Sequence, residues 1–309
     1  MSFKICLYEI KYKNSLKSLW EEVFNKTDLE SEYLISWLLS SNSGLLILAV
    51  NKSEEVIGSR ASWYWSFKNI NTSYNSAQFG LTSVHPNFRR LGIFSMLNKS
   101  CIEILENEKI DFIYNVSLPK AKKGYEKMGW IYKDNLERLT RINFLYFLSP
   151  RNKSYRISNI LNNELISRKS ISDVEQENIF SSQKINKFIN RFNMRVDIRI
   201  YESDGITIIY KKKKEKGINS IFIGEIYSNS KNLEILNTHL NTIQFAEKSF
   251  LISTYLSLNH PLNKYYLKFG FKNIKRKFQP IGVKLINQNI VMKEIHNNLV
   301  LSYIDLDTF

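Results

Sequence analysis

The chain of 309 residues contains only two cysteines, Cys6 and Cys101, and four scattered histidines. None of them stands at the spacing of a disulfide framework or a zinc site, so we expect no metal centre. The longest strongly apolar run, Gly44–Val50, is far shorter than the roughly 20 residues that span a bilayer. The first residues also lack the apolar core of a signal peptide. We therefore expect no membrane insertion and a cytoplasmic location.

Acidic residues are scarce, because 29 Asp and Glu stand against 44 Lys and Arg, for a formal net charge of +15. Such an excess favours an anionic partner, namely nucleic acid, a membrane surface or a phosphate-bearing small molecule. Simple solubility explains it equally well. The run Tyr210–Gly217 is lysine-rich, but no recognition motif accompanies it, so we expect a solvated turn and no nucleic-acid partner.

Apolar patterns typical of strands and of helices alternate along the chain, which predicts an α/β fold. One predicted strand is Lys109–Leu118, where strict alternation puts Ile113 and Asn115 on the same face. The segment Arg138–Leu148 is then expected to close the sheet of the first half.

The two halves of the sequence resemble each other. Gly124–Trp130 has a counterpart in Lys264–Phe271, each with a tyrosine and a glycine at matching positions, and a helix and a strand precede both. A repeat in constant order indicates two domains of related fold. We predict domains at residues 1–150 and 151–309, with the polar segment Ser149–Asn159 as the boundary.

One turn breaks the repeat. After the predicted strand that ends at Val84 come Arg89, Arg90 and Gly92, and a helix follows at once. A helix N-terminus already carries partial positive charge, so two cations there predict a bound anion. Glycine allows a phosphate to approach the free N–H groups of the first turn, and Ser95 adds a hydroxyl donor. Neither a Walker nor a Rossmann pattern is present. Since the second half lacks this turn, only the first half is expected to bind the anion.

The stretch VHPNFRRLGIFSML, followed by an alternating strand and GYEKMGW, resembles the GCN5-related N-acetyltransferase (GNAT) superfamily. The signature of that family, [R/Q]xxGx[G/A], follows a strand ending in V-x-P. Arg89–Phe94 fits this pattern, except that Phe94 stands where glycine or alanine is usual. The resemblance covers Gly44–Lys133 well and the second half in outline, and similar turns occur in tandem-domain members. It implies two GNAT-like domains, each a mixed central sheet flanked by helices, with the first catalytic and the second degenerate.

The resemblance also implies that acetyl-CoA binds in the first domain, with its diphosphate on the turn. The pantetheine arm is expected between two parallel strands that splay apart, one ending at Val84 and the other bearing Asn115. The residues expected to bind the cofactor are Thr82, Ser83, Val84, Arg89, Arg90, Leu91, Gly92, Ile93, Phe94, Ser95 and Asn115.

Acetyl transfer needs a proton for the leaving thiolate and a hydrogen-bond donor for the oxyanion. By resemblance, Tyr125 is the acid and the backbone N–H of Val84 polarises the carbonyl, although a tyrosine at this position can also simply pack against the sheet. The general base stays open, because the strand Ser76–Val84 contains no acidic residue. Gln78 holding a water, His85 or a chain of waters are the alternatives.

The acceptor is expected beside the strand Ser59–Phe67, in which Trp63 and Arg60 point to opposite faces. Arg60, Trp63 and Gln78 are the residues expected to bind it, although aromatic walls are also typical of an ordinary core. The leading function is acetyl transfer from acetyl-CoA to a primary amine of a small molecule, such as a free or nucleotide-linked amino sugar in surface-polysaccharide synthesis. The alternatives are a longer acyl group, an aminoglycoside or protein-lysine acceptor, and a non-catalytic acyl-CoA-binding module. The oligomeric state is open, with a homodimer among the candidates.

Overall fold

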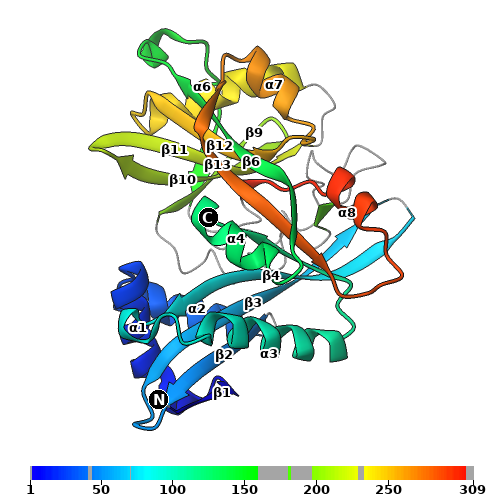
Figure 1. The fold of residues 1–309 in the computed structure, drawn as a ribbon. Helices are drawn as coiled ribbons and strands as arrows, with labels where there is room; N and C mark the ends of the chain where they lie inside the picture. The colour runs from blue at the N-terminus through cyan, green and yellow to red at the C-terminus, as the bar shows by residue number, and fades with distance from the viewer. Residues whose placement is uncertain are drawn as a thin grey trace. The chain divides into compact units, whose positions relative to one another are not determined.

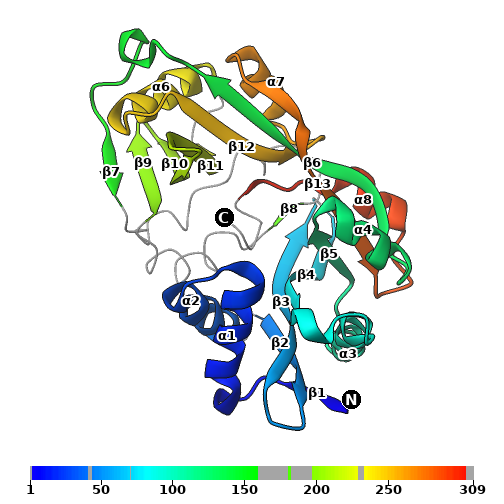
Figure 2. The ribbon, with the colours of Figure 1, turned by 60° about the vertical axis from the view of Figure 1, so that its left-hand side comes forward.

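The computed structural model describes residues 2–40, 44–69, 71–158, 180–181, 197–228 and 233–303 (Figures 1 and 2). The chain divides into two compact units. Unit 1 comprises Met1–Phe67, Ser73–Tyr132 and Ile281–Glu294, and unit 2 comprises Lys68–Thr72, Lys133–Pro280 and Ile295–Phe309. The predicted domain boundary near residue 150 stays a prediction.

Unit 1 is built on a mixed sheet with the strand order β1, β2, β3, β4, β5 and β13. β4 and β5 pair in parallel, whereas β1 with β2, β2 with β3, and β5 with β13 pair antiparallel. The strands are β1 (Phe3–Leu7), β2 (Gly44–Asn51), β3 (Val56–Lys68), β4 (Ser73–Val84), β5 (Phe112–Val116) and β13 (Lys272–Leu285).

Helices cover both faces of this sheet, with α1 and α2 on one face and α3 on the other (Figure 2). On the α1/α2 face, Trp37 stacks on Trp63 with ring centroids 5.1 Å apart. On the α3/α4 face, a stripe of α3 from Ile93 to Leu105 is buried in a core that also contains Tyr125. The helices are η1 (Ile10–Tyr12), α1 (Lys13–Phe24), α2 (Asp28–Leu39), η3 (Pro86–Phe88), α3 (Ile93–Asn107) and α4 (Pro119–Glu126).

The strand beside β5 comes from the far end of the sequence. Residues Ile281–Leu285 of β13 pair with β5, whereas β6 (Ile131–Ile142) pairs with β12 (Leu251–Ser257) in unit 2. The prediction that Arg138–Leu148 closes the first sheet is therefore wrong. Apolar alternation identifies a strand and its buried face, but it does not distinguish between partner strands when the same element occurs in both halves.

Unit 2 has the strand order β6, β12, β11, β10, β9 and β7, in which β11 and β12 are parallel. The lysine run predicted as a turn lies largely in β10, and only Lys216 and Gly217 form the turn to β11. The remaining elements are η4 (Tyr146–Leu148), β7 (Arg156–Ser158), β8 (Phe180–Ser181), β9 (Ile198–Ser203), β10 (Ile206–Glu215), β11 (Ile218–Ser228), η7 (Leu233–Ile235), α6 (Leu236–Ala246), α7 (Asn263–Lys268) and α8 (Met292–Asn298).

The two units repeat one order of elements, β4–α3–β5–α4 in unit 1 and β11–α6–β12–α7 in unit 2. After α4 and α7, Gly129 and Gly270 adopt the same left-handed conformation, with φ of 80° and 83°. The N–H of the residue after each glycine donates to the carbonyl of Tyr125 or Tyr266, respectively. The structure thus contains the predicted repeat within the predicted α/β class. Within the described ranges, no helix combines the length and the apolar character needed to cross a bilayer.

Candidate functional site

The parallel strands β4 and β5 of unit 1 separate before β4 ends. They pair over four residues only, and the last pair is Phe79 with Asn115, although β4 continues to Val84. The N–H of His85 donates to the carbonyl of Ile57 on β3 over 2.9 Å. Since successive residues of an extended strand direct their N–H groups to opposite sides, the N–H of Val84 points toward the side that β5 has left. The expected splay of these two strands is present.

A left-handed residue in β4 changes which side chains face this opening. In a regular strand, residues three apart point to opposite faces. Phe79 and Thr82 nevertheless both contact Arg60, whose guanidinium carbon lies 4.0 Å from the Phe79 ring centroid and which also donates to Thr82 Oγ1. Leu81, with φ of 45°, acts as the extra residue of a β-bulge. The bulge turns Thr82 to the α3/α4 face and Ser83 to the α1/α2 face.

The turn after β4 presents the bare N-terminus of the 15-residue helix α3. Gly92 precedes the helix with φ of 78°, no side chain caps it, and its first turn contains no acidic residue. The N–H of Met96 donates to the Gly92 carbonyl over 3.0 Å, so the N–H groups of residues 93–95 have no partner within the helix. A Cβ on Gly92 would meet no atom within 4 Å, and Leu91 and Ser95 are exposed on either side.

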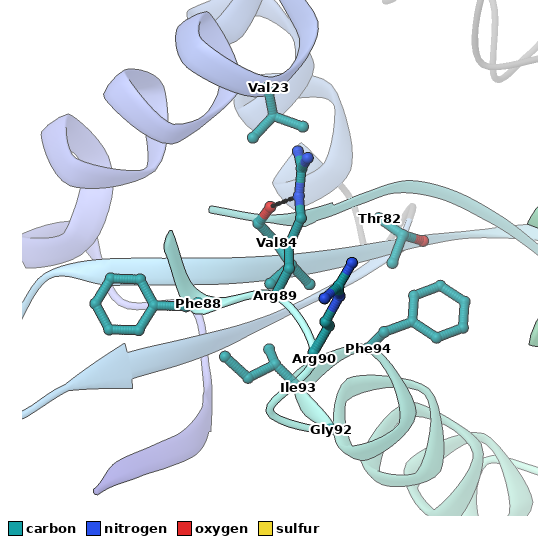
Figure 3. A pocket seen from close by; sticks show the side chains of 9 residues that line it. All are labelled: Val23, Thr82, Val84, Phe88, Arg89, Arg90, Gly92, Ile93 and Phe94. Carbon is teal, nitrogen blue, oxygen red and sulfur yellow. Dashed lines mark hydrogen bonds between the residues drawn. The ribbon is translucent and has the colours of Figure 1, made fainter. Parts of the chain in front are cut away.

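A pocket of about 430 Å³ opens at this helix end (Figure 3). Arg89 Nε donates to the carbonyl of Val84 over 3.3 Å, and Arg90 extends from the same turn. Within the described part of the chain, neither arginine forms an ion pair. The ring of Phe94 packs edge-on against Tyr125 with centroids 5.2 Å apart, so it forms a wall of the pocket. The lining residues are Val23, Thr82, Val84, Phe88, Arg89, Arg90, Gly92, Ile93 and Phe94.

Tyr125 brings a phenol to the edge of this pocket from α4. Its side chain is only 5% exposed, and its oxygen lies 3.1 Å from Arg60 Nη1 and 3.4 Å from Thr82 Oγ1. The ring packs against Trp130 as well as Phe94. Because Thr82 lines the pocket, the Tyr125 hydroxyl is one side chain away from a ligand bound there. This position suits a proton donor.

Two other polar side chains of the β4–α3 connection are engaged elsewhere. His85 Nδ1 accepts from the N–H of Asn87 over 3.2 Å, and Nε2 lies 3.0 Å from Glu22 Oε2. Ser83 Oγ lies 2.7 Å from Ser59 Oγ on the α1/α2 face. In this conformation His85 stabilises the turn, and Ser83 can reach a ligand only through its backbone. No group of three His, Cys, Asp or Glu side chains is arranged as metal ligands in the part of the chain that the structure covers.

Asn115 stands where the two strands separate. Its Oδ1 accepts a 2.9 Å hydrogen bond from Tyr132, and its buried Nδ2 has no partner among the described residues. Burial raises the pKa of the Tyr132 phenol to about 12, so the phenol keeps the proton that it donates to Asn115. A buried amide N–H that lacks a partner costs stability unless a ligand or water accepts from it. Asn115 therefore offers a hydrogen-bond donor to a ligand carbonyl.

The three residues expected to bind the acceptor lie on two different faces. Trp63 is buried on the α1/α2 face against Trp37. Gln78 is also buried there, and its Oε1 has no partner within the described residues. Arg60 lies on the opposite face against Tyr125. The aromatic strand thus contributes to the core, and an acceptor-binding role for these three residues stays a prediction.

In unit 2 the corresponding space between strands is filled by the chain itself. β11 and β12 also pair over only four residues before they separate. The N–H of Ser257 at the end of β12 donates to the carbonyl of Leu301, and Ser302 Oγ donates to Glu225 on β11, both over 3.0 Å. The buried segment Leu299–Tyr303 therefore lies where unit 1 has its opening. The connection from β11 to α6, which corresponds to the basic turn of unit 1, includes residues 229–232, and these lie outside the described residues.

A family model described as "Acetyltransferase (GNAT) domain" matches residues 6–132. This range includes the splayed strands, the basic turn, the pocket, Asn115 and Tyr125. Residues 6–132 thus match a GNAT domain, and this part of the chain carries the family likeness.

Solved structures extend this likeness to the whole chain. A probable N-acyltransferase from Enterococcus faecalis V583 has 13% sequence identity and a TM-score of 0.67, and the match covers 93% of this chain and 73% of that chain. A GCN5-related N-acetyltransferase from Anabaena variabilis ATCC 29413 has 12% identity and a TM-score of 0.68 with the same coverage. A tandem GNAT protein from the clavulanic acid biosynthesis pathway has 13% identity and a TM-score of 0.57, covering 92% of this chain and 99% of that chain. At these identities the likeness shows the fold alone, and it confirms the expected tandem GNAT architecture. A comparison with curated proteins gave no match.

Two parts of the site were not expected from the sequence. One is the contact between Arg60 and Tyr125, for which a signal existed, because Arg60 is a lone charge in the otherwise uncharged strand SRASWYWSF. A charge is seldom buried without a specific partner. The other is the support of Asn115 by Tyr132, which depends on the position of β13 and had no local signal.

Proposed function

We propose that this protein is an acetyl-CoA-dependent N-acetyltransferase that acts on a primary amine of a small molecule. The observation that carries the proposal is the pocket at the N-terminus of α3. There an uncapped helix end, the open left-handed Gly92 and the two arginines Arg89 and Arg90 converge. Backbone N–H groups and guanidinium groups in this arrangement suit a diphosphate, which accepts charge-assisted hydrogen bonds from both.

Other groups of unit 1 fit the remainder of this molecule. The N–H of Val84 and Nδ2 of Asn115 offer donors along the opening between β4 and β5, one toward an acyl carbonyl and one toward an amide. Bound acetyl-CoA supplies an activated thioester. Val84 stabilises the developing oxyanion, and Tyr125 donates its proton to the leaving sulfur. No metal takes part in this proposal, and the general base remains unassigned.

The net charge and one buried polar atom without a partner among the described residues support the proposed class of acceptor. The net charge of +15 favours an anionic acceptor over a cationic one, which supports a nucleotide-linked amino sugar. Gln78 Oε1, buried and without a partner among the described residues, supports an acceptor that donates from N–H or O–H. We place the reaction in the cytoplasm, without a nucleic-acid partner, in a protein that acts as a monomer or a homodimer.

Thiol release from acetyl-CoA by the purified full-length chain tests the activity. The amine panel contains a free amino sugar, a nucleotide-linked amino sugar, an aminoglycoside and a lysine peptide, and longer acyl-CoA donors are run in parallel. We expect release above the acceptor-free rate with an amino sugar. Acetyl-CoA binding without turnover of any amine would instead favour a non-catalytic acyl-CoA-binding module. Faster release from a longer donor would reassign the acyl group.

A pair of matched variants tests the role of Tyr125. Tyr125→Phe removes the proton donor and should lower kcat on the order of 100-fold, with acetyl-CoA affinity unchanged. Tyr266→Phe is the control, because Tyr266 holds the matching position in unit 2 and is 1% exposed. This control should leave kcat unchanged. Wild-type kcat in Tyr125→Phe would remove Tyr125 from the mechanism.

A further inference from the structure

Arg60 is a fully buried cation, 0% exposed, on the α3/α4 face of β3. Its guanidinium donates to three neutral oxygens, those of Thr82, Tyr125 and Asn98, and it stacks on the ring of Phe79. Its Nε has no partner among the described residues. Buried arginines are normally paired with a carboxylate, because desolvating an unpaired charge is costly.

No acidic side chain in the described ranges forms an ion pair with Arg60. The two arginines of the turn are exposed beside the pocket, whereas Arg60 is separated from it by Thr82 and Tyr125. A fixed cation with only neutral partners favours any negative charge that forms on those partners. Of the three oxygens, only the phenol oxygen of Tyr125 can readily become an anion in acetyl transfer.

We propose that Arg60 is a positioning residue for Tyr125, an inference that rests on the proposed function. A guanidinium has donors only, so the Tyr125 oxygen must accept from Arg60 Nη1, 3.1 Å away. The single phenol proton is then directed away from Arg60, toward Thr82 and the opening. The positive charge also stabilises the tyrosinate that remains after the proton has left.

In the acetyl-transfer step, the proton gained by the leaving thiolate equals the proton lost by the amine. As the carbon–sulfur bond of the thioester breaks, its electron pair stays on sulfur, and Tyr125 transfers its proton to form the thiol. The amine nitrogen that has bonded to the acyl carbon loses a proton, which restores the Tyr125 phenol through solvent. Arg60 keeps its own protons throughout, and its charge balances the tyrosinate in the interval.

Asn98 holds the guanidinium in this place. Its Oδ1 accepts from Arg60 Nη2 over 2.5 Å, and its Nδ2 donates to the carbonyl of Phe94 over 2.7 Å. Both ends of the amide are therefore used, and the oxygen is fixed toward Arg60. This arrangement allows the charge of Arg60 to be neutralised without removing the side chain, because Asn98→Asp places a carboxylate against the guanidinium.

Arg60→Gln and Arg60→Lys, measured beside the wild type, test the proposal. Arg60→Gln should lower kcat on the order of 10-fold or more, the scale of one charge-assisted hydrogen bond. Arg60→Lys, which keeps the charge, should restore part of the loss. The dissociation constant of acetyl-CoA, measured by calorimetry without turnover, should stay within about threefold of wild type. A larger dissociation constant with unchanged kcat would make Arg60 a binding residue and overturn the proposal.

A double-mutant cycle separates positioning from general support of the fold. In the Tyr125→Phe background, Arg60→Gln should cost less than about twofold in kcat, because its target is gone. Equal losses in both backgrounds would contradict the proposal, and urea unfolding of each variant checks that the fold is intact. If Arg60→Gln does not fold, Asn98→Asp takes its place, and wild-type kcat in that variant overturns the role of the charge. Absence of acetyl-CoA binding and of turnover in the wild type would overturn the proposed function itself.

Discussion

Tyr132 donates a hydrogen bond of 2.9 Å to Asn115, and its ring lies directly over Gly282 of β13. A strand from the far end of the sequence thus supports a residue at the point where β4 and β5 separate. The bare Cα of Gly282 is what makes room for this contact, since a Cβ there would clash with the Tyr132 ring and come within 2.6 Å of Asn115 Oδ1.

Gly282→Ala should therefore displace Tyr132 and release Asn115. We expect a loss of about 1–3 kcal/mol in the free energy of unfolding, the usual cost of overpacking, together with weaker acetyl-CoA binding. Urea denaturation and calorimetry measure the two effects. Gly124→Ala is the control, because a Cβ there meets only Phe94 at an ordinary 3.6 Å and alanine favours the helix. Equal stability of the two variants would contradict this account.

The ionisation of Tyr132 gives a pH-dependent signal. Burial raises its phenol pKa from 10.0 to about 12, so in this window the folded protein keeps a proton that the unfolded chain releases. Since the folded state binds more protons, Tyr132 contributes stability that is fully present below pH 10 and lost as the pH rises through about 12. The difference in phenolate absorbance between the wild type and Tyr132→Phe reports the ionisation of Tyr132. This difference should stay small at about pH 10.5, where an ordinary tyrosine is largely ionised. A full phenolate signal at that pH would contradict the buried position.

Gly92→Glu should abolish acetyl-CoA binding. The new carboxylate would face the diphosphate at the helix N-terminus, where like charges cost a few kcal/mol, so the affinity should fall at least about 100-fold. Gly217→Glu controls for backbone strain, because Gly217 also has a positive φ, 83°, with no atom near its Cβ position. Both variants should lose similar stability, about 1–2 kcal/mol, but only Gly92→Glu should lose the ligand in calorimetry. Wild-type affinity in Gly92→Glu would place the diphosphate elsewhere.

The two units should differ in ligand binding. Because Leu299–Tyr303 fills the gap between β11 and β12, we expect one acetyl-CoA per chain at saturation. Calorimetric titration or native mass spectrometry measures this ratio. A ratio of two would show that the segment is displaced and that unit 2 also binds.

Local patterns predicted the elements of the site but not their surroundings. The basic turn and the helix that follows it are adjacent in the sequence, so spacing and periodicity were sufficient to find them. The splay of β4 and β5 was expected only from the resemblance to the GNAT superfamily, and the structure contains it. The faces of Trp63 and Arg60 followed from strand alternation, and the structure confirms them. Alternation did not predict the left-handed conformation of Leu81. A β-bulge is an irregularity of the backbone, and a leucine in the sequence does not indicate one.

Contacts between segments far apart in the chain could not be predicted from the sequence. The strand that pairs with β5 is β13, and this pairing puts Gly282 beside Asn115. In unit 2, a segment near residue 300 fills the gap between the strands. Both arise because equivalent strands and gaps exist in both units, and a single sequence does not reveal which segment pairs with which. The contact between Arg60 and Tyr125 was also not expected, because strand position alone does not show which helix covers a face.

A crystal structure of the full-length chain with acetyl-CoA tests the central claim most directly. The account predicts that diphosphate oxygens accept hydrogen bonds from the N–H groups of residues 93–95, with the guanidinium of Arg89 or Arg90 alongside. It also predicts that the thioester sulfur approaches the hydroxyl of Tyr125. A diphosphate bound away from this turn, or a ring of Phe94 swung into the pocket in its place, would contradict it.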